Sequence, residues 1–226
     1  MVRREQAEPD PLDLLVEGAA ALGLELAPKV LEQFGIYLTE LQRWNARASL
    51  TGLNEPRDIV IKHFLDSLAV IKYLEGAASL ADLGAGAGFP GLALKLVRPE
   101  LALTLVEAKE KKAAFLEYLV SLLRLSGVEV AQVYLTPILA RRWGPRFAAV
   151  ASRAACSLEW LLELAGPLLL PGGVLLALKG PELPAAELKG ARERLARLGL
   201  SPLEFQEYCL PLSGEPRLLV RARRGL

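Results

Sequence analysis

A glycine-rich segment between a predicted strand and a predicted helix is the strongest chemical signal in the sequence. Residues 82–91 read DLGAGAGFPG and end a short apolar run that begins at Ser79. Glycines at such a turn let a ligand approach the backbone at the carboxyl end of a strand. Glu107 ends the next apolar run, where its carboxylate can accept hydrogen bonds from both hydroxyls of a ribose. Together the two signals predict a cofactor that contains adenosine.

The pattern leaves more than one adenosine cofactor open. Gly86, Gly88 and Gly91 fit the GxGxxG motif of dinucleotide-binding proteins, so NAD(P) is a possible cofactor. A turn with only a structural role is a further alternative. Asp82 favours S-adenosylmethionine, because a carboxylate attracts an ammonium or sulfonium group and repels a pyrophosphate. The chain also has room for only one mononucleotide-sized half. We therefore expect Asp82, Gly84, Gly86 and Gly88 at an S-adenosylmethionine site.

Hydrophobic periodicity predicts which elements position these residues. The first 75 residues have helical spacing after a polar tail at 1–11, with helices expected over 12–22, from Pro28 to Trp44 and from Pro56 to Ile71. Five strands then alternate with helices; the strands are expected at 79–83, 101–106, 128–134, 147–151 and 174–178, and the helices up to 97 and at 110–125, 137–142, 157–166 and 184–198. Such alternation predicts a parallel sheet covered on both faces. Two last strands, 203–210 and 216–223, are expected to form an antiparallel hairpin at its edge. The predicted organisation is a helical cap, 1–75, and an α/β domain, 76–226.

Several short motifs give the sequence a family resemblance. They are WN at 44–45, LTG at 50–52, KHFLDSL at 62–68, GAGFPG at 86–91, SRA at 152–154 and KG at 179–180. In this order they resemble the bacterial ribosomal RNA small-subunit methyltransferase G family, also called glucose-inhibited division protein B, from about Leu31 to Arg221. The resemblance implies a class I, Rossmann-like methyltransferase fold. It also implies methyl transfer from S-adenosyl-L-methionine to N7 of a guanosine in small-subunit (16S) ribosomal RNA. Because the near-neutral net charge favours a structured target, we expect an assembling subunit to present this guanosine.

The resemblance also implies roles for individual residues. It places Gly84 and Phe89 against the cofactor, Glu107 and Ala108 along its ribose and adenosine, and Arg153 beside its methionine end or the substrate.

One segment departs from the family pattern. The family usually has Arg-Ala-Glu after the third strand, and its last two residues touch the adenine. In an ungapped register these positions are Thr136, Pro137 and Ile138, so the adenine contacts would fall on Pro137 and Ile138 and an acidic acceptor is missing.

The reaction that the resemblance implies needs few catalytic groups. Guanine N7 has a lone pair and no proton at neutral pH, so attack on a methyl group requires positioning and no general base. Arg153 and Lys179 are expected to contact guanine O6 or phosphate, because basic side chains read guanine acceptors. His63 and Asp66 lie three apart on one predicted helix face and are expected at the catalytic mouth. Asn45 is either a substrate contact or a local cap.

The tryptophans and the clustered basic residues each allow two interpretations. The three tryptophans could stack on a flipped base, but packing in the core or against a helix is favoured. A solvated face is the favoured reading for the lysines at 109, 111 and 112. Arginines at 141, 142 and 146, and at 217, 221, 223 and 224, could contact phosphates.

Composition excludes or disfavours several classes of protein. Of 226 residues, 52% are hydrophobic and 23% charged, which excludes wholesale disorder and allows a sizeable core. The longest uncharged stretch, 164–178, is shorter than the ~20 residues of a membrane span and is broken by prolines and glycines. One histidine and two well-separated cysteines disfavour zinc and a Ser-His-Asp hydrolase. We expect no metal, a cytoplasmic location and a monomer.

A net charge of +1 does not by itself indicate a nucleic-acid-binding protein, but it is compatible with a local basic patch. Two alternative functions therefore remain. One is a methyltransferase that acts on a small molecule or a protein. The other is a protein that binds cofactor or RNA without turnover.

Overall fold

The computed structural model describes residues 9–74, 76–153 and 155–226. Most of the tail expected at 1–11 therefore lies outside the described residues, as does Ala154 of the SRA motif. Among the residues described, no helix is long and apolar enough to cross a membrane.

The first part of the chain is helical, as the periodicity predicts. It contains α1 (Pro11–Ala21), α2 (Pro28–Ala48), α3 (Pro56–Ile59), a π-helical turn (Val60–Leu65), α4 (Asp66–Leu68) and a 3₁₀ turn (Ile71–Leu74). Asp10 caps α1, since its side chain accepts a hydrogen bond from the backbone N–H of Leu12 at 2.7 Å. The apolar stripe of α2 is buried at helical spacing, from Phe34 to Leu41.

The helix expected from Pro56 to Ile71 is interrupted by the π-helical turn. Two carbonyl groups of this turn accept hydrogen bonds from side chains. Arg153, from a distant strand, donates to the carbonyl of Lys62 at 2.9 Å, and Ser67 donates to the carbonyl of His63 at 2.6 Å. These side chains take up carbonyls that a regular α-helix would pair only with backbone N–H groups. Single π-turns inside helices often occur at functional sites.

A seven-stranded sheet follows, with the order β3-β2-β1-β4-β5-β7-β6. The strands are β1 (Ser79–Leu83), β2 (Ala102–Glu107), β3 (Val128–Gln132), β4 (Phe147–Arg153), β5 (Leu169–Lys179), β6 (Glu204–Cys209) and β7 (Pro216–Arg223). The first five are parallel, while β7 pairs antiparallel with both β5 and β6. The predicted parallel sheet with an antiparallel hairpin at its edge is confirmed.

The strand order reverses at β1, which lies between β2 and β4. In open α/β sheets, ligands bind outside the carboxyl ends of the strands at such a switch point. The turn after β1 and the last residues of β2 and β4 therefore meet where a ligand is expected.

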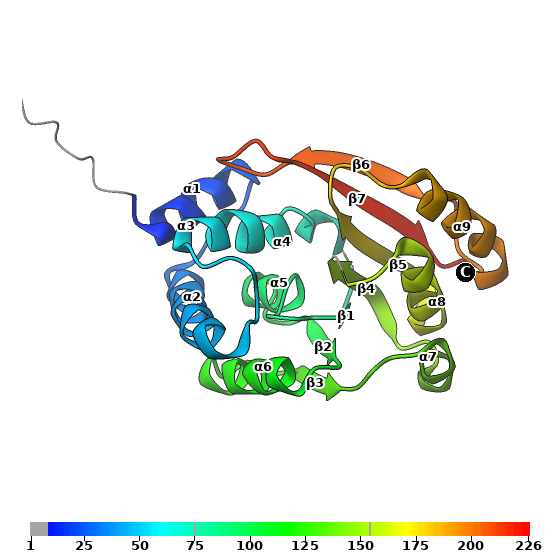
Figure 1. Ribbon diagram of the computed structural model, residues 1–226, viewed down its shortest axis with the longest axis horizontal. Helices are drawn as coiled ribbons and strands as arrows, with labels where there is room; N and C mark the ends of the chain where they lie inside the picture. The colour runs from blue at the N-terminus through cyan, green and yellow to red at the C-terminus, as the bar shows by residue number, and fades with distance from the viewer. Residues whose placement is uncertain (1–8, 75, 154) are drawn as a thin grey trace, which may run out of the picture.

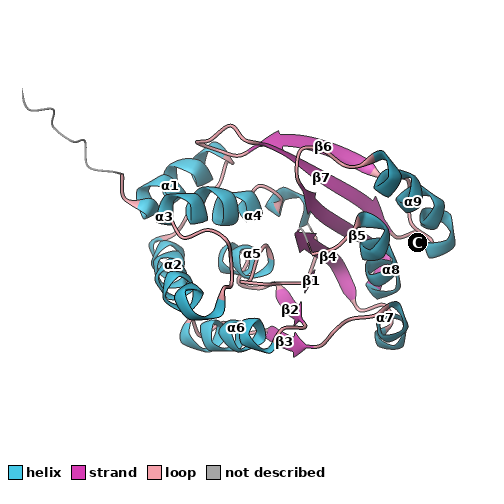
Figure 2. Cartoon of the chain, in the orientation of Figure 1, coloured by secondary structure: helices cyan, strands magenta, loops and turns pink. Residues whose placement is uncertain are grey.

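Helices cover both faces of the sheet (Figures 1 and 2). They are α5 (Gly91–Val97), α6 (Glu110–Leu122), α7 (Pro137–Trp143), α8 (Leu158–Leu168) and α9 (Ala185–Leu195). Alternate strand residues face opposite ways: Leu80 belongs to a core with α5, α6 and the N-terminal helices, and Ala81 to a core with α7, α8 and α9.

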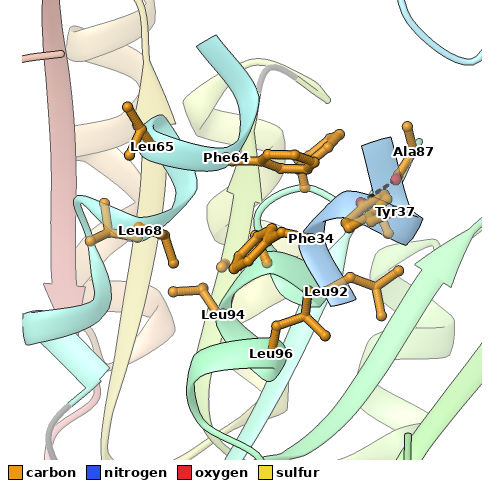
Figure 3. Close-up of a cluster of buried hydrophobic side chains, with 14 of the residues drawn as sticks. Phe34, Tyr37, Phe64, Leu65, Leu68, Ala87, Leu92, Leu94 and Leu96 are labelled. Carbon is orange, nitrogen blue, oxygen red and sulfur yellow. Dashed lines mark hydrogen bonds between the residues drawn. The ribbon is translucent and has the colours of Figure 1, made fainter. Parts of the chain in front are cut away.

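The N-terminal helices share a core with the sheet. In Figure 3, side chains of α2 and of the interrupted helix pack together with leucines of α5. The Tyr37 hydroxyl also donates to the carbonyl of Ala87, in the glycine-rich turn, at 2.5 Å. The boundary predicted between 75 and 76 falls beside Glu75, outside the described residues, and the core is continuous across it. The interrupted helix is thus fixed against the turn after β1.

The fifth strand begins earlier than its expected start at Val174. Leu169 already pairs with Phe147, and Val174 pairs with Ala149, so the register shifts between these pairs. Residues 170–173 form this irregularity, and Gly172 adopts a φ of 75° there. The predicted turn at 171–173 therefore lies within β5.

Candidate functional site

A cavity of about 740 Å³ opens at the carboxyl ends of β1, β2, β4 and β5. Its described wall comes from the loop 50–53, the interrupted helix, the turn after β1, the segment from the end of β2 into α6, the ends of β4 and β5, and Arg217 of β7. Cavities of this size hold small ligands and cofactors.

The turn after β1 exposes backbone to this cavity. Gly84 and Gly86 line it, and both have positive φ, at 72° and 60°. A Cβ at Gly86 would make only ordinary contacts, 3.8 Å from the carbonyl oxygen of Gly84 and 3.9 Å from Lys112 Nζ. Gly88 is not part of the wall, and a Cβ there would lie 2.5 Å from the Tyr37 hydroxyl. Gly88 therefore serves packing, while Gly86 presents its backbone to a ligand.

Asp82 lies fully buried beneath the turn. Its Oδ2 accepts a hydrogen bond from the N–H of Gly91 at 2.7 Å, which fixes the start of α5. Its Oδ1 has no hydrogen-bond partner among the described residues. Burial raises the pKa of Asp82 to about 7, although the Gly91 N–H and the charge of Arg153 act against this shift. Asp82 does not line the cavity, so its charge reaches a ligand there only through the turn.

Glu107 stands where two cavities meet. One carboxylate oxygen accepts from the N–H of Gly86 at 2.9 Å and the other from the N–H of Lys109 at 2.8 Å. A second cavity, of about 280 Å³, adjoins the first at Gly84, Glu107 and Ala155. Each carboxylate oxygen of Glu107 has a further lone pair for a ligand.

The smaller of these cavities is mostly apolar. Its wall includes Ala108 and, after β3, the residues Val133, Tyr134 and Leu135. Pro137 and Ile138 line neither cavity. They open α7, which Thr136 caps, and Ile138 is 64% exposed. The structure therefore brings residues 133–135, and not the two that the ungapped register named, to the pocket beside Ala108.

Arg153 is the centre of a polar network at the mouth. One guanidinium nitrogen donates to Asp66 Oδ2 at 3.2 Å and to the carbonyl of Lys62 at 2.9 Å; the other lies 2.9 Å from His63 Nδ1. The guanidinium also stands 5.0 Å from the centroid of the Phe89 ring. The Tyr208 hydroxyl donates to the other oxygen of Asp66 at 2.8 Å. His63, Asp66, Phe89 and Arg153, all predicted site residues, are thus together.

His63 contacts its neighbours through both ring nitrogens. Nδ1 lies 2.9 Å from a guanidinium nitrogen of Arg153, which can only donate, and 3.0 Å from the carbonyl oxygen of Lys62, which can only accept. Nε2 lies 2.7 Å from Thr51 Oγ1. Burial and the Arg153 charge lower the pKa of His63 to about 3. His63 is therefore neutral near pH 7 and too weakly basic to accept a proton there.

Asn45 and Lys179 are both held by the protein. Asn45 does not line the cavity; its side chain bonds the backbone of Thr51 and Leu53 and fixes the loop that meets His63. Lys179 lines the cavity, but its ammonium donates to the carbonyl of Cys156 and to Glu187, each at 2.9 Å.

Several residues of the site were not predicted there. Thr51 and Lys62 line the cavity, and Tyr208 bonds Asp66. Lys109 and Lys112, expected on a solvated face, also line the cavity, as does Arg217, one of the arginines considered for phosphate contact. Thr51 and Lys62 lie within the motifs 50–52 and 62–68, so the sequence contained a signal for them. Tyr208 and Arg217 come from the edge hairpin, and no local pattern connects them with Asp66.

The described residues contain no group of three or more His, Cys, Asp or Glu side chains that could hold a metal ion.

Solved structures similar to this chain share its fold. The precorrin-6y C5,15-methyltransferase of Geobacter metallireducens is 15% identical and covers 70% of this chain and 87% of its own, with a TM-score of 0.54. The tRNA (m1A58) methyltransferase of Aquifex aeolicus is 17% identical and covers 72% of this chain and 69% of its own, with a TM-score of 0.53. The predicted Rossmann-like methyltransferase fold is confirmed.

Sequence comparison identifies the family. Residues 30–211 match the profile of rRNA small subunit methyltransferase G (GidB). A relative from Deinococcus deserti with this name is 42% identical over 94% of this chain and 87% of its own. Another from Geobacter sp. strain M21 is 36% identical over 92% of this chain and 95% of its own. The chain therefore belongs to the rRNA small subunit methyltransferase G family.

Proposed function

We propose that this protein transfers a methyl group to N7 of a guanosine in small-subunit ribosomal RNA, presented by an assembling subunit. One observation carries the choice of N7: His63, the only histidine, is neutral and bound on both ring nitrogens, so it provides no base at the mouth. N7 suits such a site because it has no proton to lose. Methylation of a protonated nitrogen or a hydroxyl would require one.

S-adenosyl-L-methionine is the cofactor, as the sequence predicts and as membership of a methyltransferase family supports. When bound, it supplies a methyl group on a sulfonium, which a lone pair can take while the bonding electrons return to sulfur.

The described residues fit this cofactor. The orphaned Oδ1 of buried Asp82 suits the positive methionine end, and the open backbone of Gly86 allows close approach. Glu107 accepts hydrogen bonds from the ribose hydroxyls with its remaining lone pairs. The apolar cavity beside Ala108 and Leu135 takes the adenine ring.

Arg153 positions the guanine. It already holds Asp66 and His63, so its place at the mouth is fixed before RNA binds. From there its guanidinium donates to O6, leaving N7 free, and Phe89 excludes water beneath it. Positioning of this kind contributes to rate without proton transfer.

The mouth favours RNA over a small molecule or a protein. Besides Arg153, the cavity wall contains Lys62, Lys109, Lys112 and Arg217. Lys109 and Lys112 form no ion pair with any described residue. A smooth mouth without basic residues would have favoured the smaller substrates. Phosphates are the natural partners of such a rim.

Label transfer tests the class of substrate. Small subunits from a strain that lacks guanosine N7 methylation would be incubated with the protein and radiolabelled S-adenosyl-L-methionine, and RNA, protein and small molecules would be separated. We expect label in the RNA. Label in the protein or small-molecule fraction would contradict the proposal, as would measurable cofactor binding without label in subunits or assembly intermediates.

The buried carboxyl group of Asp82 makes cofactor affinity depend on pH. Because burial holds the pKa of Asp82 at about 7, the group is mostly protonated below that pH and charged above it. A positively charged cofactor binds the charged form better, so its Kd is expected to fall as pH rises through about 7. Calorimetric titration of the wild-type protein with the cofactor between pH 6 and 8 measures this change in Kd.

Asp82→Asn is expected to bind the cofactor more weakly and to lose this pH dependence. Asp13→Asn, a change on the exposed side of α1, is the matched control. An equal pH dependence in wild type and Asp82→Asn would show that Asp82 does not face the charge.

A further inference from the structure

A separate cavity, of about 550 Å³, lies between α2 and α6, outside the site described above. These two helices pack side by side at the lower left of Figure 1. Arg43, Trp44 and Arg47 come from α2, and Lys111 and Tyr118 from α6. The wall thus combines aromatic rings with basic side chains.

The aromatic part of the wall is held in place. Trp44 packs against Phe115 with ring centroids 5.6 Å apart, and lies 5.3 Å from Tyr118. The Tyr118 hydroxyl donates to Glu40 at 3.1 Å. Both Trp44 and Tyr118 are only half-buried, so they leave ring surface for a ligand. Rings fixed in this way are suited to stack on a base.

The charge around these rings is positive. Arg47 and Lys111 are exposed and have no ion-pair or hydrogen-bond partner within the described part of the chain. The side chain of Arg43 is 68% exposed and approaches only Glu40, at 3.6 Å. Glu110 is the one acidic residue in the described wall. Three cations against one carboxylate favour an anionic ligand.

The first turn of α6 separates this cavity from the catalytic one. Lys109 and Lys112 line the catalytic cavity, whereas Glu110, Lys111 and Ala114 line the other. The loop 50–53, part of the catalytic wall, follows directly after α2. A helix with its side chains is about 10 Å wide, so one strand of RNA can reach both cavities.

We propose that the cavity between α2 and α6 is a second nucleotide-binding site, which holds an unpaired base and its phosphate next to the target guanosine. The proposal rests on the proposed RNA methyl transfer and adds a subsite to it. The base stacks on Trp44 and Tyr118, while Arg47 and Lys111 bind phosphate oxygens. Unpaired bases stacked on aromatic rings and flanked by basic side chains are the usual form of single-stranded RNA recognition.

Removing the two free cations tests the site. Arg47→Ala/Lys111→Ala is expected to raise KM for small subunits about tenfold and to leave kcat and cofactor affinity unchanged. The plot of log binding constant against log salt should become flatter by about 1.4, since each lost contact to a single strand removes about 0.7.

A matched control carries the same change of charge elsewhere. Lys189 and Arg192 are exposed on α9, at the opposite end of the sheet, and form no ion pair with a described residue (Figure 1). Lys189→Ala/Arg192→Ala should therefore keep the wild-type KM and salt slope.

Trp44→Leu tests stacking separately, with an expected loss of about tenfold in RNA binding. Because Trp44 also packs on Phe115, thermal unfolding must be followed for this variant. The charge variant alters exposed side chains only and decides the matter if Trp44→Leu is unfolded.

The outcomes separate this inference from the proposed function. Wild-type protein that binds small subunits without methylating them overturns the proposed function, while the salt slope of its binding still tests the second site. Wild-type methylation together with an unchanged KM and slope in Arg47→Ala/Lys111→Ala overturns the second site alone. A raised KM with an unchanged salt slope also overturns it, because the partner would then not be the RNA backbone.

Discussion

Arg153→Ala is expected to lower kcat/KM for methyl transfer by at least about 100-fold, because positioned charge at the reacting base is lost. It is also expected to lower the free energy of unfolding by about 3 kcal/mol, because buried Asp66 loses its nearer cation and keeps only Arg217, 3.9 Å away. Both effects follow from the network that Arg153 holds. Asp66 is only 4% exposed and pairs with this guanidinium at 3.2 Å. Activity assays and denaturant unfolding measure the two losses.

A double variant separates stability from activity. Arg153→Met/Asp66→Asn removes both charges, so it should be more stable than Arg153→Ala, yet it should remain inactive. Arg141→Ala is the control: the Arg141 side chain is 54% exposed, lies 3.7 Å from Glu163 and does not line the cavity. Its loss should change stability by no more than about 0.5 kcal/mol. Wild-type activity in Arg153→Ala would show that this residue is not part of the site.

Glu107→Ala is expected to weaken cofactor binding by about 1.5–3 kcal/mol, which is roughly a 10- to 150-fold rise in Kd. A charged acceptor for two ribose hydroxyls disappears in this variant. The N–H groups of Gly86 and Lys109 also lose their partner, which loosens the turn that meets the cofactor. Isothermal calorimetry with S-adenosyl-L-methionine measures the change.

Glu117→Gln provides the control for this prediction, since Glu117 is exposed on α6 and lines neither cofactor cavity. Its Kd should equal that of the wild type. An unchanged Kd in Glu107→Ala itself would place the ribose elsewhere and contradict the assignment of β2.

The fold could be predicted from the sequence because apolar spacing alone distinguishes its elements. The strands correspond to short apolar runs, and the helices to apolar residues at helical spacing. The last two apolar runs have no helix between them, which predicted the hairpin. The π-turn could not be predicted, because its Lys62 carbonyl accepts a hydrogen bond from Arg153, 91 positions away in the sequence. Periodicity contains no information about such a contact.

The site could be predicted only where a local motif carries it. His63, Asp66, Phe89 and Arg153 belong to short motifs, and the structure brings them together. Tyr208 does not, since it reaches Asp66 across 142 positions through the pairing of β6 with β7.

Other site predictions depended on information that spacing lacks. Asn45 bonds the backbone of Thr51, and Lys179 is paired with Glu187. Both contacts depend on how side chains pack, which the sequence pattern does not show. The positions of Pro137 and Ile138 depended on an ungapped register after β3, whereas residues 133–135 line the pocket there.

Nucleoside analysis of the methylated RNA is the most direct test of methyl transfer to N7. Small subunits that lack this modification would be treated with the protein and S-adenosyl-L-methionine, and the RNA would be digested and examined by mass spectrometry against standards of the methylguanosine isomers. We expect 7-methylguanosine in a single fragment, formed at least about 100-fold more slowly by Arg153→Ala. A methyl group on another guanine atom, on the ribose or on another base would contradict the assignment of a site without a general base.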